Sequence, residues 1–202
     1  MIKIKICGMT NEKDVHQARA AGANLLGFIF AESLRKVTVE TARRLCANIE
    51  GTEGVAVVRG LPVDEVRRIR EETGLRWVQF HEPAPPETVL TFAPFVLRVF
   101  DRFGEAERAS LSRFAGAAFL LDRPKGGGGP DPDPAFAAEA RKVGPVLLAG
   151  SLDPGNVAEA IRRFRPDGVD VCSALEASPG KKDPATVRAF IQAVRAAEGK
   201  SV

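Results

Sequence analysis

The chain alternates between two patterns of hydrophobic and polar residues. Short apolar runs, such as IKIKIC at 2–7 and LLGFIF at 25–30, are separated by longer amphipathic segments rich in Arg, Glu and Ala. Apolar residues with a period of two are typical of strands, and a period near 3.6 is typical of helices. The pattern therefore predicts strand and helix in regular alternation along the whole chain.

Eight such units are predicted. The apolar runs predict strands at 2–7, 25–30, 54–59, 76–80, 95–100, 117–121, 145–149 and 168–172. The amphipathic segments predict helices at 12–21, 39–48, 63–73, 86–92, 105–114, 134–142, 155–164 and 185–197. Repeated strand–helix order implies parallel strands with right-handed crossovers. The pattern favours an α/β fold, a (β/α)₈ TIM barrel that forms a single domain over 1–202, and the alternative is an open doubly wound sheet.

No linker divides this pattern, because the glycine-rich stretch GGGGPDPDP at 126–134 follows a predicted strand and is interpreted as a loop.

The composition, 45% hydrophobic and 27% charged, is that of an ordinary globular protein. The net charge is +3, and the basic residues form no blocks, so we expect no nucleic-acid partner and no membrane partner. No apolar run approaches the roughly 18 residues of a membrane span, and the N-terminus does not resemble a signal peptide.

The three cysteines, Cys7, Cys46 and Cys172, lie far apart and form no CxxC motif. A disulfide framework or a structural zinc site is therefore not expected. Free thiols without an export signal indicate a cytoplasmic protein.

Polar residues and glycines follow several of the predicted strands. In a barrel these positions meet on one rim, where active sites lie. Each residue alone has an ordinary explanation, since a lone cysteine is usually a small buried hydrophobe and an aspartate often caps a turn. Together they predict a site that contains Cys7, Arg35, Asp122, Gly150, Ser151, Asp170, Ser173 and Ala174.

Cys7 shares one face of the first strand with Lys3 and Lys5. Lysines do not fit the apolar face of that strand, so we expect both to line the barrel interior with Cys7. A nearby ammonium group stabilises a thiolate and lowers the pKa of the thiol. Cys7 is therefore a candidate base or nucleophile.

The turns after the last two strands are candidates for binding phosphate. Gly150-Ser151 follows the seventh strand and Ser173-Ala174 follows the eighth, which is the usual phosphate position in such barrels. Backbone N–H groups and the N-terminus of a short helix bind the anion there. The SALEAS stretch at 173–178 is predicted to supply that helix.

The order of the motifs resembles the phosphoribosylanthranilate isomerase family. The resemblance rests on KICGMT at 5–10, SLRKVT at 33–38, VQFH at 78–81, LLD at 120–122, LAGSLDPGNV at 148–157 and GVDVCSALEASPGKKD at 168–183. It implies an isomerase of tryptophan biosynthesis that converts N-(5′-phosphoribosyl)anthranilate to 1-(2-carboxyphenylamino)-1-deoxyribulose 5-phosphate. This Amadori rearrangement is an aldose–ketose isomerisation, an intramolecular oxidoreduction, and the family uses neither a metal nor an organic cofactor.

The resemblance also implies roles for individual residues. Cys7 would act as the base, in its thiolate form, and Asp122 as the acid that opens the ribose ring. Arg35 would pair with the anthranilate carboxylate, and Asp170 would orient the reacting groups. The backbone around Gly150, Ser151, Ser173 and Ala174 would hold the phosphate.

The chain departs from the family pattern at several of these positions. The family commonly has glycine where this chain has Ser151, and SSG where it has Cys172-Ser173-Ala174. Serine and alanine are tolerated there if φ stays negative. Because serine is common at position 172, Cys172→Ser is expected to be nearly silent.

Two other functions stay open, another phosphosugar-handling barrel enzyme and a non-catalytic protein that binds a phosphate ligand. The partner in each case is a small phosphorylated molecule. A homodimer is possible, because exposed apolar residues could form a dimer face.

Overall fold

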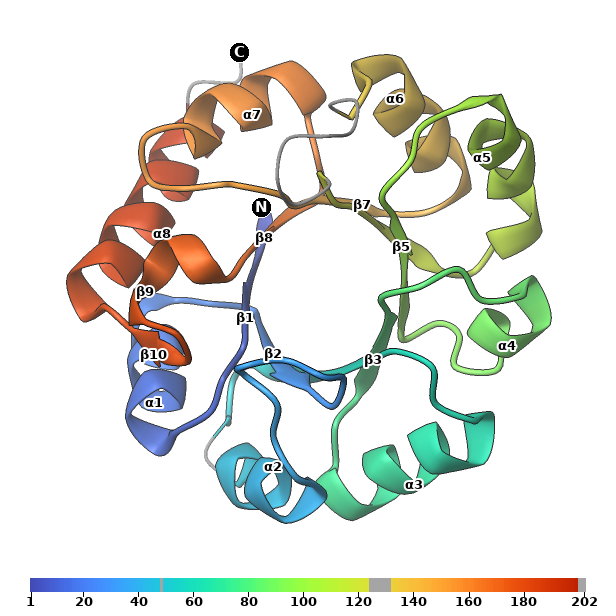
Figure 1. Cartoon of the computed structure of the whole chain (residues 1–202). Helices are drawn as coiled ribbons and strands as arrows, with labels where there is room; N and C mark the ends of the chain where they lie inside the picture. The colour runs from blue at the N-terminus through green and yellow to red at the C-terminus, as the bar shows by residue number, and fades with distance from the viewer. Residues whose placement is uncertain (48, 124–131, 200–202) are drawn as a thin grey trace.

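The computed structural model describes residues 1–47, 49–123 and 132–199, and its centre is a closed barrel of eight parallel strands (Figure 1). The strands are β1 Lys3–Cys7, β2 Leu25–Ile29, β3 Glu53–Val58, β4 Trp77–Phe80, β5 Val96–Phe100, β6 Ala118–Leu121, β7 Val146–Leu148 and β8 Gly168–Val171. Each strand pairs with the next, and β8 pairs with β1. The predicted (β/α)₈ barrel is thus confirmed, and the open sheet is wrong.

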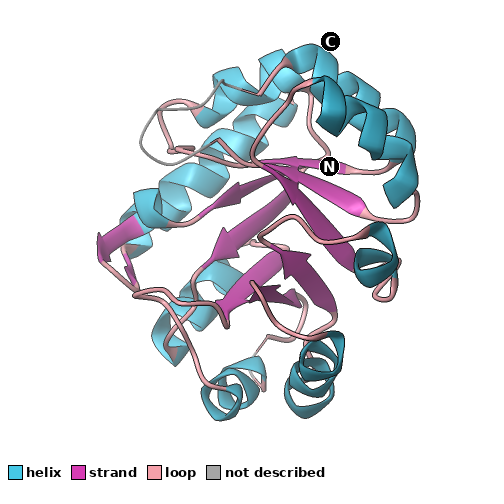
Figure 2. Cartoon of the chain, turned by 45° about the vertical axis from the view of Figure 1, so that its right-hand side comes forward, coloured by secondary structure: helices cyan, strands magenta, loops and turns pink. Residues whose placement is uncertain are grey.

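A ring of helices surrounds the strands (Figures 1 and 2). They are α1 Glu12–Ala21, α2 Val39–Cys46, α3 Val63–Thr73, α4 Pro86–Leu90, α5 Glu105–Ser110, α6 Pro134–Val143, α7 Val157–Phe164 and α8 Pro184–Glu198. The segment predicted as a helix over 105–114 divides into α5 and a 3₁₀ turn, η1 Leu111–Phe114. Within the described ranges no helix is long and apolar enough to cross a membrane.

Polar side chains cap the N-termini of several of these helices. The side chains of Asn11, Thr38 and Asp183 accept hydrogen bonds from backbone N–H groups in the first turns of α1, α2 and α8. These bonds satisfy donors that the helix itself leaves unpaired. Pro184 then occupies the first turn of α8, where its fixed φ suits a helix and its missing N–H costs nothing.

The strand residues divide between two layers of core. Ile4 and Ile6 face the helices and belong to the outer layer. The inner layer fills the barrel and consists of Cys7, Leu25, Val55, Val57, Leu97, Val99, Ala118, Leu120, Leu147 and Ala149. Lys5 is fully buried, as predicted, but Lys3 is exposed. Lys3 lies on the same side of the strand, near the inner-layer residue Leu147, but it begins the strand and its side chain is exposed.

A small hairpin follows β8 and was not predicted. The SALEAS stretch forms only a 3₁₀ turn, η2 Ser173–Leu175, before the chain turns into β9 Glu176–Ser178 and β10 Lys181–Lys182. Gly180 has φ +77° between these strands, a conformation that glycine adopts without steric cost. Most of the predicted loop at 126–134 lies outside the described residues.

Candidate functional site

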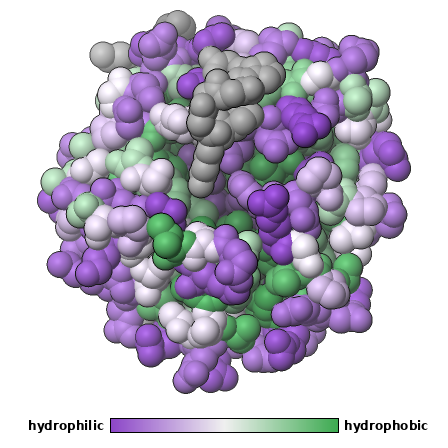
Figure 3. Space-filling model, viewed as in Figure 1, coloured by the Kyte–Doolittle hydropathy of each residue, from purple (hydrophilic) through white to green (hydrophobic). Residues whose placement is uncertain are grey.

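A cavity of about 710 Å³ lies at the carboxyl ends of the barrel strands. Its lining includes every residue that the sequence nominated: Cys7, Arg35, Asp122, Gly150, Ser151, Asp170, Ser173 and Ala174. Figure 3 views the molecule along the barrel and shows polar and apolar residues together around its centre. The cavity also has apolar walls, formed in part by Val57, Val99 and Ala149.

A buried ion pair lies beneath the cavity. Lys5 Nζ donates a hydrogen bond of 2.9 Å to Asp170 Oδ1, and the two residues are register partners on β1 and β8. Burial lowers the pKa of Lys5, but the attraction of Asp170 and of Cys7 outweighs burial and raises it. Lys5 is therefore a fixed positive charge, largely neutralised by Asp170.

Cys7 and Cys172 face each other at the ends of β1 and β8. The neighbouring Cys172 thiol, together with burial, raises the pKa of Cys7 well above its ordinary value despite the charge of Lys5. The predicted lowering of the Cys7 pKa is therefore wrong. The main reasons are the neighbouring Cys172 thiol and burial, and the Asp170 carboxylate also disfavours a thiolate on Cys7.

Cys172 has the opposite electrostatic environment. The neighbouring Cys7 side chain lowers the pKa of Cys172 to about 6, and the charges of Lys182 and Arg35 contribute in the same direction against burial. Lys182 Nζ lies 3.9 Å from Cys172 Sγ. Cys172 is also less buried than Cys7. The carboxylate of Asp170 opposes these two cations and raises the pKa of Cys172.

Arg35 is held in place by a carboxylate from the hairpin. Its Nε and Nη2 donate hydrogen bonds of 2.7 and 2.6 Å to the two oxygens of Glu176. Lys182 Nζ also donates to Glu176, at 3.0 Å, and to the carbonyl oxygen of Cys172, at 3.0 Å. Burial raises the pKa of Glu176, but the bonds from Arg35 and Lys182 outweigh it and leave that pKa lowered. Among the described residues, Nη1 of Arg35 makes no hydrogen bond, and the residue lines the cavity.

The two turns predicted to bind phosphate differ in backbone conformation. Gly150 has φ +86°, and a Cβ there would lie 2.4 Å from the backbone nitrogen of Arg123. Ser151 has φ +54°, so the condition that φ stays negative is not met at this serine. The hydrogen bond of 2.8 Å from Asn156 Nδ2 to the Ser151 carbonyl helps to hold the turn. The condition is met at Ser173 and Ala174, neither of which has a positive φ.

Asp122 lies on the other side of the cavity from Cys7. It follows β6, and its backbone N–H donates a hydrogen bond of 2.9 Å to the carbonyl oxygen of Phe100. The side chain is half-buried and lines the cavity. The site therefore has a thiol pair on one wall and a carboxyl group on another.

The sequence analysis assigned no role to three of the polar residues at the site. Glu176 and Lys182 are buried beside Arg35, and Gln79 is 2% exposed and lines the cavity. The Oε1 atom of Gln79 has no hydrogen-bond partner among the described residues. A signal for Gln79 was present, since it is a polar residue inside the apolar strand WVQF.

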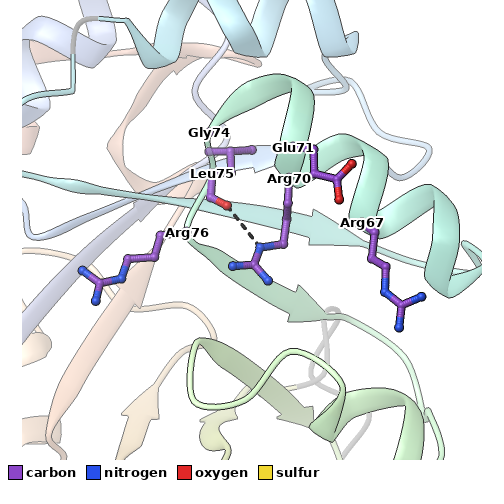
Figure 4. A pocket seen from close by; sticks show the side chains of 6 residues that line it. All are labelled: Arg67, Arg70, Glu71, Gly74, Leu75 and Arg76. Atoms are coloured by element: carbon purple, nitrogen blue, oxygen red, sulfur yellow. Dashed lines mark hydrogen bonds between the residues drawn. The ribbon is translucent and has the colours of Figure 1, made fainter.

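A second depression lies at the C-terminal end of α3, near the start of β4, and is rich in arginine (Figure 4). Its arginines are engaged elsewhere. Arg70 Nε donates to the Leu75 carbonyl at 3.3 Å, Arg76 pairs with Glu53 at 2.5 Å and Arg67 pairs with Asp64 at 3.0 Å. The side chains of Arg67 and Arg76 diverge in Figure 4. We therefore assign no ligand to this depression.

Metal-ligating side chains do not cluster in the part of the chain that the structure describes. Over residues 1–47, 49–123 and 132–199, no group of three or more His, Cys, Asp or Glu residues is arranged to hold a metal ion.

Comparisons with known proteins point to one family. A family model described as N-(5′-phosphoribosyl)anthranilate (PRA) isomerase matches residues 4–193. The N-(5′-phosphoribosyl)anthranilate isomerase of Deinococcus radiodurans is 41% identical over 203 residues, which cover 96% of this chain and 97% of the relative.

Solved structures give the same result. Phosphoribosyl anthranilate isomerase from Thermotoga maritima superposes with a TM-score of 0.87 at 30% identity, covering 97% of this chain and 100% of that one. The enzyme from Thermus thermophilus superposes with a TM-score of 0.84 at 32% identity, covering 96% and 99%. A third structure, of the isomerase in complex with reduced 1-(o-carboxyphenylamino)-1-deoxyribulose 5-phosphate, has a TM-score of 0.85 at 29% identity and covers 97% and 100%.

Proposed function

Since the chain belongs to the N-(5′-phosphoribosyl)anthranilate isomerase family, we propose that the cavity at the carboxyl ends of its strands is the active site. The protein is an isomerase of tryptophan biosynthesis and converts N-(5′-phosphoribosyl)anthranilate to 1-(2-carboxyphenylamino)-1-deoxyribulose 5-phosphate. In our proposal the reaction is an intramolecular oxidoreduction of the aldose–ketose type, in which C1 is reduced while C2 is oxidised.

Asp122 acts as the general acid and Cys7 as the general base. Protonation of the ribose ring oxygen by Asp122 opens the ring and leaves an iminium at C1, which acidifies the proton on C2. Cys7, as thiolate, removes that proton, and the resulting enamine tautomerises to the ketone. Two such groups acting from different sides of one cavity are sufficient for this chemistry. The support for both roles is that Cys7 and Asp122 line the same cavity from β1 and from the end of β6.

Arg35 binds the anthranilate carboxylate through the part of its guanidinium that Glu176 leaves available. The Nε and Nη2 edge of the guanidinium is occupied by Glu176, whereas Nη1 is not engaged among the described residues. A planar guanidinium carries enough donors to bind two carboxylates on different edges. Glu176 thus orients Arg35, and Asp170 fixes Lys5 beneath the reacting atoms.

The phosphate binds at the turns that follow β7 and β8. The support is that Gly150, Ser151, Ser173 and Ala174 line the cavity, and the donors in this proposal are their backbone N–H groups. Backbone donors of this kind satisfy the oxygens of a phosphate without a side-chain charge. The positive φ of Gly150 and Ser151 turns the backbone at this point of the rim.

We further propose that the chain functions as one domain in the cytoplasm and forms a homodimer. A similar structure from Thermotoga maritima, at 29% identity, is described as monomers generated from a dimeric phosphoribosylanthranilate isomerase. In this chain Leu34, on the loop after β2, is a large apolar residue that is 80% exposed. Sedimentation velocity is expected to show a dimer at micromolar concentration, and a monomer throughout would contradict the proposal.

Catalysis by Cys7 and Asp122 is tested by complementation and by kinetics. Wild-type protein should restore growth without tryptophan to a bacterium that lacks this isomerase. Cys7→Ala and Asp122→Asn should each lower kcat by at least about 100-fold while substrate still binds, since general acid–base groups contribute 10²–10⁴. Cys46→Ala, on α2 and outside the cavity, is the matched control and should behave as wild type. Turnover near the wild-type rate in either variant would remove that residue from the reaction.

A further inference from the structure

The acidic side chains that line the cavity differ in burial. Glu32 and Asp101 are exposed, and Asp122, the proposed acid, is half-buried. Asp170 is 8% exposed and is the most buried of the cavity carboxylates among the described residues. Water screens a buried charge less than an exposed one, so Asp170 acts more strongly on a charge inside the cavity. In the proposed reaction it has no role beyond its bond to Lys5.

The ion pair between Lys5 and Asp170 has a direction. Lys5 Nζ lies 2.9 Å from Asp170 Oδ1, and the Lys5 side chain is 0% exposed whereas that of Asp170 is 9% exposed. Asp170 lines the cavity, and Lys5 does not. The second carboxylate oxygen, Oδ2, accepts no hydrogen bond from any of the described residues. The pair therefore presents its negative end, with a free acceptor oxygen, to the cavity.

Asp170 lies close to the place where the proposed base acts. It is the register partner of Lys5, which precedes Cys7 by two residues on β1. Residues two apart in a strand share a face and lie about 7 Å from each other. The side chain of Arg35 lies at the same strand ends, because a Cβ added to Gly8 would lie 2.8 Å from Arg35 Cδ.

These positions locate C1 of the substrate. Cys7 acts on C2, and Arg35 binds the carboxylate of the anthranilate, whose nitrogen is attached to C1. C1 is bonded both to C2 and to that nitrogen, so it lies between the two atoms that these residues position. The C1–N unit is therefore held at the β1–β8 junction, on the side of the cavity to which Asp170 belongs.

The C1–N unit is also where the proposed reaction develops a positive charge. When Asp122 protonates the ring oxygen, the C1–O bond breaks and its electrons stay on that oxygen. The nitrogen lone pair forms the C1–N double bond, which spreads one positive charge over both atoms. When Cys7 removes the C2 proton, the C–H electrons form the C1–C2 double bond and the C–N electrons return to nitrogen. The positive charge therefore exists only between ring opening and proton removal.

We propose that Asp170 is a further catalytic residue, whose carboxylate contacts the C1–N unit and stabilises the iminium. This inference rests on the proposed function and deepens it. Asp170 exchanges no proton and forms no covalent bond in this step, because its contribution is electrostatic. Lys5 acts through Asp170 and is a positioning residue, since it fixes the carboxylate and balances its charge in the empty cavity. A preorganised charge aimed at a charge that develops during the reaction lowers the barrier.

The kinetic test is Asp170→Asn, which keeps the shape of the side chain and removes its charge. The substrate is uncharged at C1 and nitrogen before the ring opens, so kcat should suffer more than KM. We expect kcat to fall about 100-fold and KM to change less than about fivefold.

Two stable analogues measure the interaction with positive charge directly. Both are 5-phosphorylated pentitols that carry a substituted amine on C1. One amine bears a 2-carboxyphenyl ring and is neutral at neutral pH, and the other bears a 2-carboxycyclohexyl ring and is protonated. Calorimetry gives the Kd of the neutral analogue divided by that of the protonated one. Comparing this ratio between wild type and a variant isolates the effect of charge, because the difference in ring shape cancels.

Asp170→Asn should lower this ratio about tenfold or more. The double variant Lys5→Met/Asp170→Asn lacks both charges of the pair and should show the same loss, which separates the effect from that of a buried lysine without its partner. Asp101→Asn is the matched control, because it removes an exposed carboxylate from the same cavity. It should change the ratio less than about twofold.

The outcomes separate this inference from the proposed function. A ratio that is unchanged in Asp170→Asn and in the double variant would overturn the role of Asp170. Equal weakening of both analogues, as a purely structural role would produce, leaves the ratio unchanged and would overturn it too, as would a kcat of Asp170→Asn near the wild-type value. In these cases turnover by wild type would leave the proposed function intact. Absence of turnover by wild type would overturn the proposed function and this inference together.

Discussion

Gln79 places an amide inside the apolar interior of the barrel. Its Oε1 lacks a hydrogen-bond partner among the described residues, although the side chain is 2% exposed. A buried acceptor left unpaired costs about 1–3 kcal/mol. The residue lines the cavity, and we expect a donor on the substrate to reach this acceptor. The residue therefore lowers the stability of the empty protein and gains a partner when the cavity is filled.

Gln79→Leu should accordingly change stability and activity in opposite directions. We expect the free energy of unfolding to rise by about 1 kcal/mol, because the unpaired amide is removed, and kcat/KM to fall about tenfold, because a substrate hydrogen bond is lost. Urea denaturation and steady-state kinetics measure the two effects. A variant that is more stable and fully active would show that Gln79 does not contact the substrate.

Ser151 is a second residue that lowers the stability of the folded protein, in this case through its backbone conformation. A non-glycine residue in the left-handed region costs on the order of 1 kcal/mol, and Ser151 has φ +54°. Ser151→Gly should therefore raise the free energy of unfolding by up to about 1 kcal/mol, measured by urea denaturation. Gly150→Ala is the matched opposite case and should be destabilising, because its Cβ would clash with the backbone of Arg123. Equal effects of the two substitutions would contradict this reading of the turn.

At the scale of elements, the β9–β10 hairpin links parts of the chain that are distant in sequence. Glu176 binds Arg35 from the loop after β2, and Lys182 binds the Cys172 carbonyl at the end of β8. The backbone N–H of Lys182 donates a hydrogen bond of 2.8 Å to Asp14 on α1. A short hairpin thus fixes the rim between the first, second and last strands. Unlike an ordinary surface loop, this hairpin buries two charged side chains, those of Glu176 and Lys182.

The contribution of Glu176 should depend on pH. Its pKa is lowered in the folded protein, so its charged form stabilises the fold above its ordinary pKa of about 4.5, and this stability is lost as pH falls through the lower folded value. At neutral pH, Glu176→Gln should lower the free energy of unfolding by about 3 kcal/mol, because it leaves two buried cations poorly compensated. Urea denaturation at a series of pH values should show the difference from wild type shrinking below about 4.5.

A control for this measurement is Glu32→Gln, since Glu32 pairs with Lys36 at an exposed position. Exposed ion pairs contribute little, so this variant should differ from wild type by less than about 1 kcal/mol at any pH. A Glu176→Gln variant as stable as this control would show that the hairpin is not held by its ion pairs.

At the scale of the whole molecule, closure of the barrel joins the two ends of the chain. β1 pairs with β8, and α1 packs against α8. Arg195 on α8 donates to the carbonyl oxygen of Ile2 at 2.8 Å, and the backbone N–H of Ile2 donates to Glu198. The apolar face of α8 includes Phe190, which is fully buried. The last helix is thus part of the same core as the first strand.

Phe190→Ala should test this closure. We expect the free energy of unfolding to fall by about 3–5 kcal/mol, the usual cost of removing a buried phenylalanine. The values of kcat and KM should be unchanged where the variant is folded, because Phe190 does not line the cavity. Urea denaturation combined with kinetics at low temperature measures both quantities. Arg188→Ala, on an exposed position of the same helix, should be close to wild type in stability.

The sequence by itself determined the order of the elements and the rim on which the polar residues meet. Hydrophobic periodicity is a local property, and eight strand–helix units in this length leave few ways to bury their apolar faces. Once the strands are parallel, their carboxyl ends lie at one end of the barrel. The residues after them, from Cys7 to Ala174, therefore line one cavity whatever the details of packing.

Only the tertiary structure decided the electrostatics of that cavity. Lys5 and Asp170 are 165 residues apart, and Arg35 and Glu176 are 141 apart. Which charges meet depends on strand register and on a hairpin that has too few residues to show a period. The pKa of a thiol depends on the charges within a few ångströms of it. The sequence IKIKIC alone therefore does not show that Lys5 is paired with Asp170. For the same physical reason, the sequence did not show that Lys182 and Arg35 both lie beside Cys172.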